Sequence, residues 1–524
     1  MHLIGEVSRT QWRPNYSRLR SKACREKSAE VIVPCEDSTR EGLNPTEVNI
    51  VKHHQMKGRM QKISARNDSR PQKNRPEAKG YEGVQTFMRV VDGYLTTEQP
   101  KQEYPLLEQI LSPDNLNAAY KQVKSNGGAP GIDKMDCNRL LDYLREHGEQ
   151  LTESIRQRTY RPNPVRRVEI PKDNGKKRQL GIPTVVDRLV QQAINQVLMP
   201  IYERQFSNRS YGFRPHKSCH HALHEAKKII NEGYHYVIDF DLERFFDSVN
   251  HSKLIEILSR TIKDGRVISL IHKYLKSGVL VRGMFQSSEE GTPQGGPLSP
   301  LLSNIMLHEL DKELERRGHP FVRYADDALI FCKSKRAANR VRKSISCFIE
   351  NLLYLKVNQE KTVVSYVQGI KYLGYSFRVS KEKCSLTVHS KSKTKLKSKL
   401  KELTKRSNGW SYEKRKQKLQ EYMRGWVGYF HLAEMKRLCI ETDEWLRRRI
   451  RMCIWKSWKK IKTKVANLIR CGIEKYQAYQ WGNTRKGYWR IADSAILKRA
   501  IPNTSLKVAG YPCLTDLYLE WNLK

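Results

Sequence analysis

The residues best suited to chemistry are two adjacent carboxylates, Asp326 and Asp327, which lie between two apolar runs. These runs, 321–323 and 328–332, are rich in β-branched and aromatic side chains and predict a β-hairpin with a polar tip. Adjacent carboxylates at such a tip oppose folding, because like charges raise each other's pKa. A divalent cation would remove that cost, and oxygen ligands suit Mg²⁺. Taken alone, however, an Asp-Asp pair is more often ordinary turn chemistry.

A second acidic site follows an apolar segment. Residues 236–242 read as a strand that is apolar enough to be central in a sheet, and Asp239 and Asp241 would share one face of it. The aromatic residues Phe245 and Phe246 come almost directly afterwards. Packing alone does not readily explain a buried strand that ends in acidic residues and is followed by two aromatic rings.

Two cations are placed near each other by a predicted hairpin. Asn174-Gly175 separates two strand-like runs, which is a strong hairpin signal. The hairpin would bring Lys172 and Arg178 together at a basic tip. Such a pair could neutralise a triphosphate, Arg through a bidentate fork and Lys as a point charge. A merely solvated basic hairpin is an equally good explanation from these residues alone.

A turn-rich loop, residues 290–300, precedes a helix that begins at Leu301 and has a long apolar stripe. Its glycines allow a ligand to approach the backbone closely, and Gln294 offers both a donor and an acceptor.

The composition indicates a polyanionic partner. The 524 residues contain 97 Lys and Arg against 55 Asp and Glu, a formal net charge of +42, so nucleic acid is the first candidate. Mean hydropathy is −0.69, and no apolar run approaches the roughly 18 residues that span a bilayer. The 11 cysteines form no Cys-x-x-Cys pair, which argues against a disulfide framework or a zinc ribbon and favours a reducing compartment, here the cytoplasm.

The C-terminal quarter is basic and aromatic. Residues 391–470 contain 25 Lys and Arg against 7 Asp and Glu, with apolar residues at helical spacing, which predicts a helical bundle with a basic surface. Most of its tryptophans are expected in the core, with a minority stacking on RNA bases. A second basic-aromatic patch contains Arg485, Lys486 and Arg490. No Cys/His cluster follows, so we expect no metal-dependent nuclease.

The motifs occur in an order that resembles a reverse transcriptase. The basic hairpin precedes segments similar to motifs A, B, C, D and E of that class, namely 241–246, 292–299, 324–327, 358–362 and 372–374. More narrowly, 178–188, 210–215 and 291–300 resemble bacterial group II intron reverse transcriptase/maturases, and 485–490 resembles the C-terminal DNA-binding part of that family. The resemblance covers about 105–524. The N-terminal extension has no counterpart in the family. We expect no endonuclease domain of the kind that some members carry, which suggests priming at available DNA ends.

The resemblance implies an α+β right hand. It assigns 101–384 to fingers and a palm with an antiparallel sheet, 385–465 to a helical thumb that is also the RNA-binding maturase domain, and 466–524 to a small DNA-binding domain. Its partners would be group II intron RNA, target DNA, dNTPs and an RNA template with a DNA primer, with no membrane. Composition alone assigns 1–100 to a basic, poorly ordered extension.

The resemblance also implies roles for single residues. Asp241, Asp326 and Asp327 would be catalytic and hold two Mg²⁺ ions, for which Mn²⁺ could substitute. Lys172 and Arg178 would clamp the phosphates of the dNTP, and Gln294 would contact the nucleotide. Phe246 resembles the steric gate that rejects a ribose 2′-hydroxyl. Lys361 would protonate the pyrophosphate, although a solvated turn lysine is an equally good interpretation.

These assignments predict an RNA-directed DNA polymerase that copies intron RNA into cDNA during retrohoming and promotes splicing by binding the intron. The alternatives are a domesticated reverse transcriptase in repair or defence, and a splicing-only maturase. An RNA-dependent RNA polymerase would share the palm, but the bulky Phe246 disfavours it.

Overall fold

The computed structural model describes residues 88–91, 94–97 and 105–523, with gaps at 172–174, 176, 282, 293–294 and 382. Its four sheets contain the strands β1 (Met88–Val91), β2 (Tyr94–Thr97), β3 (Val165–Pro171), β4 (Lys177–Ile182), β5 (Tyr236–Phe240), β6 (Val279–Val281), β7 (Met284–Gln286), β8 (Phe321–Tyr324), β9 (Asp327–Cys332), β10 (Val363–Tyr366), β11 (Lys371–Tyr372), β12 (Tyr375–Ser380) and β13 (Lys383–Val388).

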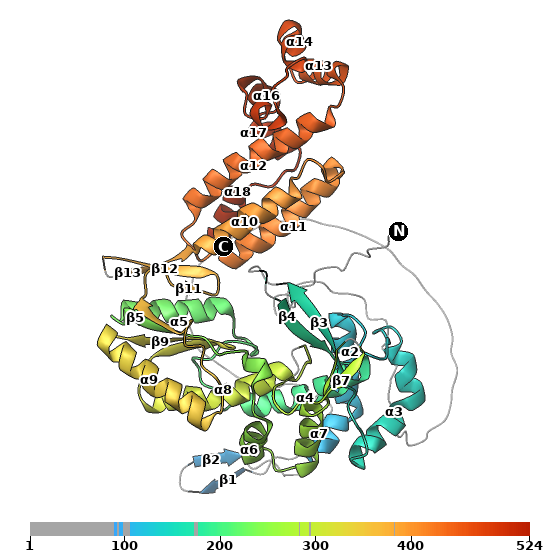
Figure 1. Ribbon diagram of the computed structural model, residues 1–524, viewed down its shortest axis with the longest axis vertical. Coiled ribbons are helices and arrows are strands. Elements are labelled where there is room, and N and C mark those ends of the chain that lie inside the picture. The colour runs from blue at the N-terminus through green and yellow to red at the C-terminus, as the bar shows by residue number, and fades with distance from the viewer. Residues whose placement is uncertain are drawn as a thin grey trace, which may run out of the picture.

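The helices fall into two groups along the chain (Figure 1). The first group surrounds the sheets and comprises α1 (Leu106–Leu111), α2 (Pro113–Asn126), α3 (Leu140–Arg156), α4 (Val185–Glu203), α5 (Cys219–Asn231), α6 (His251–Thr261), α7 (Gly265–Leu275), α8 (Ser299–Arg316) and α9 (Lys335–Leu352). The second group is C-terminal and comprises α10 (Ser390–Leu403), α11 (Tyr412–Phe430), α12 (Lys436–Ser457), α13 (Ile461–Arg470), α14 (Lys475–Gly482), α15 (Tyr488–Ile491), α16 (Ala495–Ala500), α17 (Asn503–Val508) and α18 (Leu514–Asn522).

The central sheet is antiparallel, with the strand order β10-β5-β9-β8. The predicted central strand is therefore the internal strand β5, and the predicted hairpin around Asp326 is β8–β9. Both sequence predictions are confirmed. The other predicted hairpin is also present, because β3 pairs with β4 in a second sheet of order β4-β3-β6-β7.

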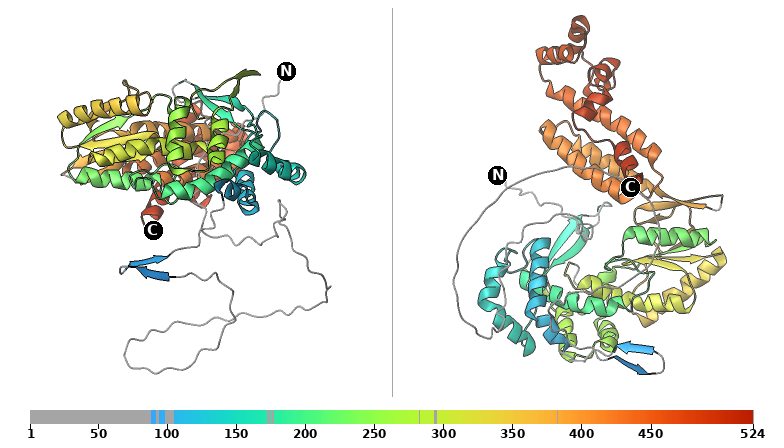
Figure 2. Two further views of the ribbon diagram at one scale, coloured as in Figure 1. Left: turned by 90° about the horizontal axis from the view of Figure 1, so that it is seen from below. Right: turned by 180° about the vertical axis from the view of Figure 1, so that it is seen from behind.

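Period-two alternation divides the central sheet into two buried faces. Ile238 and Phe240 of β5 belong to the core that includes α8 and α9. Val237 and its partner Phe331 belong to a second core, which includes α5. The views of the ribbon agree that α5 and α9 lie on opposite sides of this sheet (Figures 1 and 2). Because both faces are covered, the strand is apolar except at its end.

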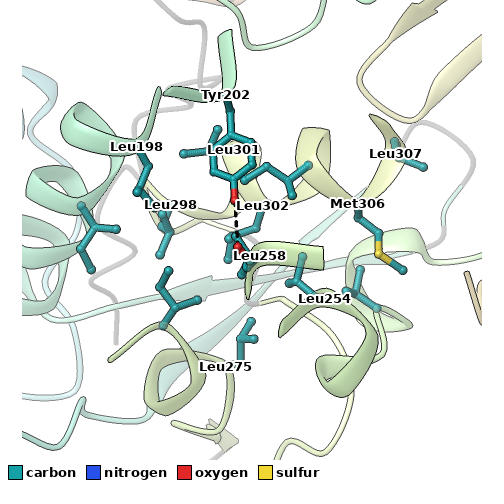
Figure 3. Close-up of a cluster of buried hydrophobic side chains, with 14 of the residues drawn as sticks. Leu198, Tyr202, Leu254, Leu258, Leu275, Leu298, Leu301, Leu302, Met306 and Leu307 are labelled. Carbon is teal, nitrogen blue, oxygen red and sulfur yellow. Dashed lines mark hydrogen bonds between the residues drawn. The ribbon is translucent and has the colours of Figure 1, made fainter. Parts of the chain in front are cut away.

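A leucine-rich cluster lies between α4, α6, α7 and α8, and these four helices share one hydrophobic core (Figure 3). Leu258 and Leu301 are completely buried, and Leu198 reaches them from α4. Tyr202 contributes a polar group to this cluster, and its hydroxyl donates a hydrogen bond to the Leu258 carbonyl at 3.4 Å. Its burial therefore leaves no unpaired hydroxyl in the cluster.

The C-terminal helices share a core with the small sheet β11-β12-β13 and with α5. Trp426 and Trp455 are buried in it, and Trp410, Trp445 and Trp458 pack against it while partly buried. This agrees with the prediction that most of these tryptophans serve packing. The Asp443 carboxylate of α12 accepts hydrogen bonds from the backbone amides of Leu514 and Thr515, at 2.8 and 2.9 Å, and so binds the start of α18. The predicted segment 466–524 thus packs into the same core as the helices before it.

Within the extension that was predicted to lack ordered elements, β1 and β2 pair as an antiparallel hairpin. Residues 1–87 lie outside the described part of the chain.

Among the helices that the structure describes, none combines the length and apolar character required to cross a bilayer.

The leucine cluster predicts the cost of a cavity. Leu301→Ala should lower the free energy of unfolding by about 2–5 kcal/mol, because the buried site cannot collapse fully. Urea denaturation followed by circular dichroism measures this. Leu352→Ala is the control, because Leu352 is 53% exposed and its removal should change stability by less than about 0.5 kcal/mol. Equal losses in the two variants would contradict the assigned core.

Candidate active site

Strand register brings the acidic residues together. Phe240 at the end of β5 pairs with Ala328 of the antiparallel strand β9. Asp241 follows Phe240 and Asp327 precedes Ala328, so these two aspartates lie side by side at the same edge of the sheet. Asp327 also pairs with Tyr324 across the β8–β9 hairpin, which leaves Ala325 and Asp326 at its tip. The three predicted catalytic aspartates therefore gather at one edge, although the sequence separates the first from the other two by more than 80 residues.

A buried arginine supports the hairpin tip from below. Arg323 is 1% exposed, and its guanidinium donates through Nε to the Asp311 carboxylate at 2.7 Å and through a second nitrogen to the same carboxylate. Its third nitrogen donates to Asn304 Oδ1 and to the Ala325 carbonyl, both at 3.0 Å. Ala325 has a φ of +59°, a conformation that costs free energy for a residue with a Cβ. The arginine thus stabilises an unfavourable turn.

The segment 210–215 lies directly against this turn. The Asn304 amide donates to the Gly212 carbonyl at 2.8 Å, and the Tyr211 amide donates to the Arg323 carbonyl at the same distance. A Cβ on Gly212 would lie 2.2 Å from the backbone nitrogen of Ala325. Only glycine permits this approach.

The acidic edge perturbs its own carboxyl groups. Exclusion of water by the surrounding chain, and then the charges of Asp326, Asp239 and Asp241, raise the pKa of Asp327 to about 6, although its side chain remains accessible from the open side. Burial and the charge of Asp241 raise the pKa of Asp239 to about 6 as well. Lys371 opposes both shifts. The edge therefore concentrates more negative charge than it can stabilise by itself.

Lys361 neutralises part of this charge. Its ammonium lies 2.7 Å from Asp241 Oδ2, and the turn that carries it is tied to the end of β5, since the Asn358 amide donates to the Asp241 carbonyl at 2.9 Å. Thr362 accepts a hydrogen bond from the Asp241 amide at 3.3 Å. The predicted turn 358–362 is thus adjacent to the acidic edge.

The donor set at this edge fits a divalent cation. Its side chains supply only carboxylate oxygens, which hard cations such as Mg²⁺ prefer, and their mutual repulsion is the kind of cost that a cation removes. As they stand, no three acidic, imidazole or thiol side chains within the described ranges converge closely enough to hold a metal ion. The Lys361 ammonium lies against the Asp241 carboxylate that a cation would use.

Phe246 follows Asp241 in the sequence and lies in a short 3-10 turn, Phe245–Asp247. It is 8% exposed and packs edge-on against Phe245, with ring centroids 5.3 Å apart. Its carbonyl accepts a hydrogen bond from the Thr292 amide at 2.6 Å, so the start of the loop 290–300 is attached to it. The same loop approaches β4, since a Cβ on Gly295 would lie 2.3 Å from the Gly181 carbonyl oxygen.

Of three residues predicted to contact the nucleotide, the structure describes the position of one, Arg178. Lys172 and Gln294 lie outside the described residues. Arg178 is in β4, opposite Ile170 of β3. The close approach of Gly295 to Gly181 does bring the loop that carries Gln294 next to the strand that carries Arg178.

The predicted C-terminal nucleic-acid residues are far from this edge in the sequence and are exposed. Arg485, Lys486 and Arg490 are all accessible, and the Lys486 ammonium lies 4.9 Å from the ring centroid of Trp481. Arg448 lies over Trp489 at 3.9 Å. These contacts form a basic surface with partly exposed rings.

Sequence reasoning assigned no role to the residues that support the edge. Asp239 was placed on the same face as Asp241 but was not counted in the site. Arg323, Asp311 and Asn304 were not singled out, although a charged residue inside the apolar run 321–323 was a visible signal. Gly212 was noted only as part of a motif.

Comparisons with known proteins identify two family matches along the chain. Residues 170–377 match the family described as reverse transcriptase (RNA-dependent DNA polymerase), and residues 393–472 match the group II intron, maturase-specific domain. The fold and the acidic edge therefore define an α+β reverse transcriptase domain followed by a helical maturase region.

The relatives define the family more narrowly. Protein YkfC of Escherichia coli is 33% identical over 333 residues, which cover 56% of this chain and 87% of YkfC. The group II intron-encoded protein LtrA of Lactococcus lactis is 33% identical over 340 residues, 52% of this chain and 56% of LtrA, so the chain spans little more than half of that relative's length. The chain belongs to the group II intron reverse transcriptase/maturase family.

One solved structure aligns with part of the chain. A chain of a partial Cas6-RT-Cas1–Cas2 complex is 26% identical and aligns with 50% of this chain and 46% of its own length. The TM-score is 0.32, which is too low to support an inference about this protein.

The contact at Gly212 generates a test. Gly212→Ala should reduce primer extension by roughly 100-fold, because the added methyl must displace the turn and a shift of about 1 Å in catalytic groups has effects of that size. Template–primer affinity should change little. Gly148→Ala is the control, since nothing lies within 4 Å of its Cβ position. Full activity of Gly212→Ala would show that the turn does not depend on this approach.

Proposed function

We propose that this protein is an RNA-directed DNA polymerase that copies group II intron RNA into cDNA during retrohoming, and a maturase that binds the intron and promotes its splicing. The observation that carries the polymerase proposal is the β5–β9 register, which puts Asp241 beside Asp327. The carboxylate-only donor set supports dependence on Mg²⁺, with Mn²⁺ as a substitute.

In this proposal Asp241, Asp326 and Asp327 bind the metal ions. Bound Mg²⁺ would make the primer 3′-hydroxyl easier to deprotonate and would neutralise negative charge on the triphosphate. The chain's own groups would orient the reactants: Arg323 and Gly212 position the turn, and Asp239 adds negative charge behind it. Lys361 would leave Asp241 when the cation binds, which frees its ammonium to donate a proton to the pyrophosphate.

The remaining assignments concern the substrates. Lys172 and Arg178 would clamp the triphosphate, and Gln294 would contact the nucleotide. The proximity of the loop 290–300 to β4 supports a shared nucleotide site.

The nucleic-acid assignments follow the helices. We assign 101–384 to fingers and palm, 385–465 to the thumb and intron-binding domain, and 466–524 to DNA binding through Arg485, Lys486 and Arg490. The exposure of these three cations supports contact with phosphates. We place the protein in the bacterial cytoplasm, associated with the nucleoid during mobility, because the relatives LtrA and YkfC are bacterial proteins.

The proposed gate makes the polymerase selective for dNTPs. Phe246→Ala should raise the relative use of rNTPs by roughly tenfold or more, because the removed ring would no longer exclude a 2′-hydroxyl. Extension of a DNA primer on an RNA template, with each set of nucleotides, measures the ratio. Phe246→Tyr keeps the ring and should keep the discrimination. An unchanged ratio in Phe246→Ala would contradict the gate.

The maturase function should survive loss of polymerisation. Asp241→Asn should abolish cDNA synthesis and leave protein-stimulated splicing of the intron within about twofold of the wild type, because the ribozyme performs the transesterification and the basic helical surface is unchanged. Splicing rates at low Mg²⁺ test this. Loss of splicing in a folded Asp241→Asn protein would show that the two activities share the acidic edge.

A further inference from the structure

A groove lies at the junction of the small sheet and the C-terminal helices. Its walls are the β12–β13 hairpin, the first turns of α10 and the start of α12, and its volume is about 600 Å³. Figures 1 and 2 show this hairpin at the base of the helical region. Ligand-binding clefts typically have volumes of about 300–1,000 Å³.

The groove presents unpaired cations at its rim. Arg378, Lys393 and Lys397 are exposed, and none of the three has a partner among the described residues. Lys393 and Lys397 are four residues apart on α10 and therefore project from the same face. A fourth cation, Arg437, is already bound to Glu441, with Nε 2.8 Å from the carboxylate.

The floor of the groove is apolar but not aromatic. Val388 and Met435 are buried, and Leu438 is half-buried. None of the described side chains that line the groove is aromatic, so bases cannot stack there. The cations can bind phosphates instead, which indicates recognition of a backbone without regard to sequence.

An acidic residue also lies at the rim of the groove. Glu434 is exposed, and its backbone amide donates to the Leu386 carbonyl of β13 at 2.8 Å, which fixes its position beside the groove. A carboxylate repels phosphates but accepts a hydrogen bond from a hydroxyl. A ribose 2′-hydroxyl is the one backbone donor that RNA has and DNA lacks.

We propose that this groove binds the sugar-phosphate backbone of an RNA strand, with phosphates on Arg378, Lys393 and Lys397 and a 2′-hydroxyl donating to Glu434. The inference rests on the proposed RNA-binding function and names a site for it outside the acidic edge. It concerns RNA that the protein binds as a partner, and not the template–primer duplex that it copies.

The test compares two pairs of lysines on one helix. Lys393→Gln/Lys397→Gln removes the groove cations, and Lys391→Gln/Lys395→Gln removes two exposed lysines with the same spacing from the other side of α10. The affinity of the full chain for a single-stranded RNA of mixed sequence is measured against salt, together with primer extension at saturating template–primer. The groove variant should bind this RNA about tenfold more weakly, with a salt slope smaller by about 1.4, as expected for two lost phosphate contacts. Its primer extension should remain within twofold of the wild type, and the control pair should lose less than half of that affinity change.

Several results would overturn the proposal. Equal loss in the two variants would mean that only the net charge of α10 matters, and unchanged affinity in the groove variant would exclude the site. Loss of extension with unchanged RNA affinity would assign the groove to the template–primer duplex. A wild type that binds this RNA but extends no primer would contradict the proposed polymerase function alone and leave the groove comparison valid.

Two further measurements are local. In the folded protein, excess RNA should protect Lys393 and Lys397 from an amine-reactive label more strongly than Lys391. Glu434→Ala should reduce the ratio of RNA to DNA affinity, measured with oligonucleotides of one sequence, by about threefold. An unchanged ratio would overturn the role of Glu434.

Discussion

Repulsion among carboxylates at one end of the β5–β9 pair is the constraint on which the rest of the structure depends. The register puts Asp241 beside Asp327, with Asp239 and Asp326 close enough to shift the pKa of Asp327 upward. A fold selected only for stability would not gather these charges. We therefore interpret the surrounding elements as offsetting this carboxylate repulsion, which a bound cation would relieve.

Compensation takes two forms. Lys361 forms an ion pair with Asp241 directly, at a partly exposed position where it can be exchanged for a cation. Arg323 acts from within the core, where a buried ion pair costs desolvation free energy that only a complete set of hydrogen bonds offsets. Its contacts with Asp311, Asn304 and Ala325 supply that set. Because these bonds join α8 to the tip of the β8–β9 hairpin, the arginine fixes the positions of Asp326 and Asp327.

Local patterns predicted the elements well because their causes are local. The alternation in 321–332 and the apolar run before Asp241 predicted β5, β8 and β9, and Asn174-Gly175 marked the β3–β4 hairpin. The supports were not predicted, because they depend on contacts between distant segments. Nothing near Gly212 indicates that it touches Ala325, and Asp311 looks like one more polar residue on an amphipathic helix until the fold places it under Arg323. The attachment of α18 to Asp443 is likewise a contact over 71 residues of sequence.

The central claim is that the gathered aspartates form a metal-dependent polymerase centre. The most direct test is extension of a DNA primer on an RNA template with Mg²⁺ and dNTPs, comparing the wild type with Asp326→Asn. The account predicts long cDNA from the wild type and none from the variant, while both bind the template–primer with the same affinity. A wild type that binds structured RNA tightly but extends nothing would contradict it, and the protein would then be a splicing factor built on a polymerase fold.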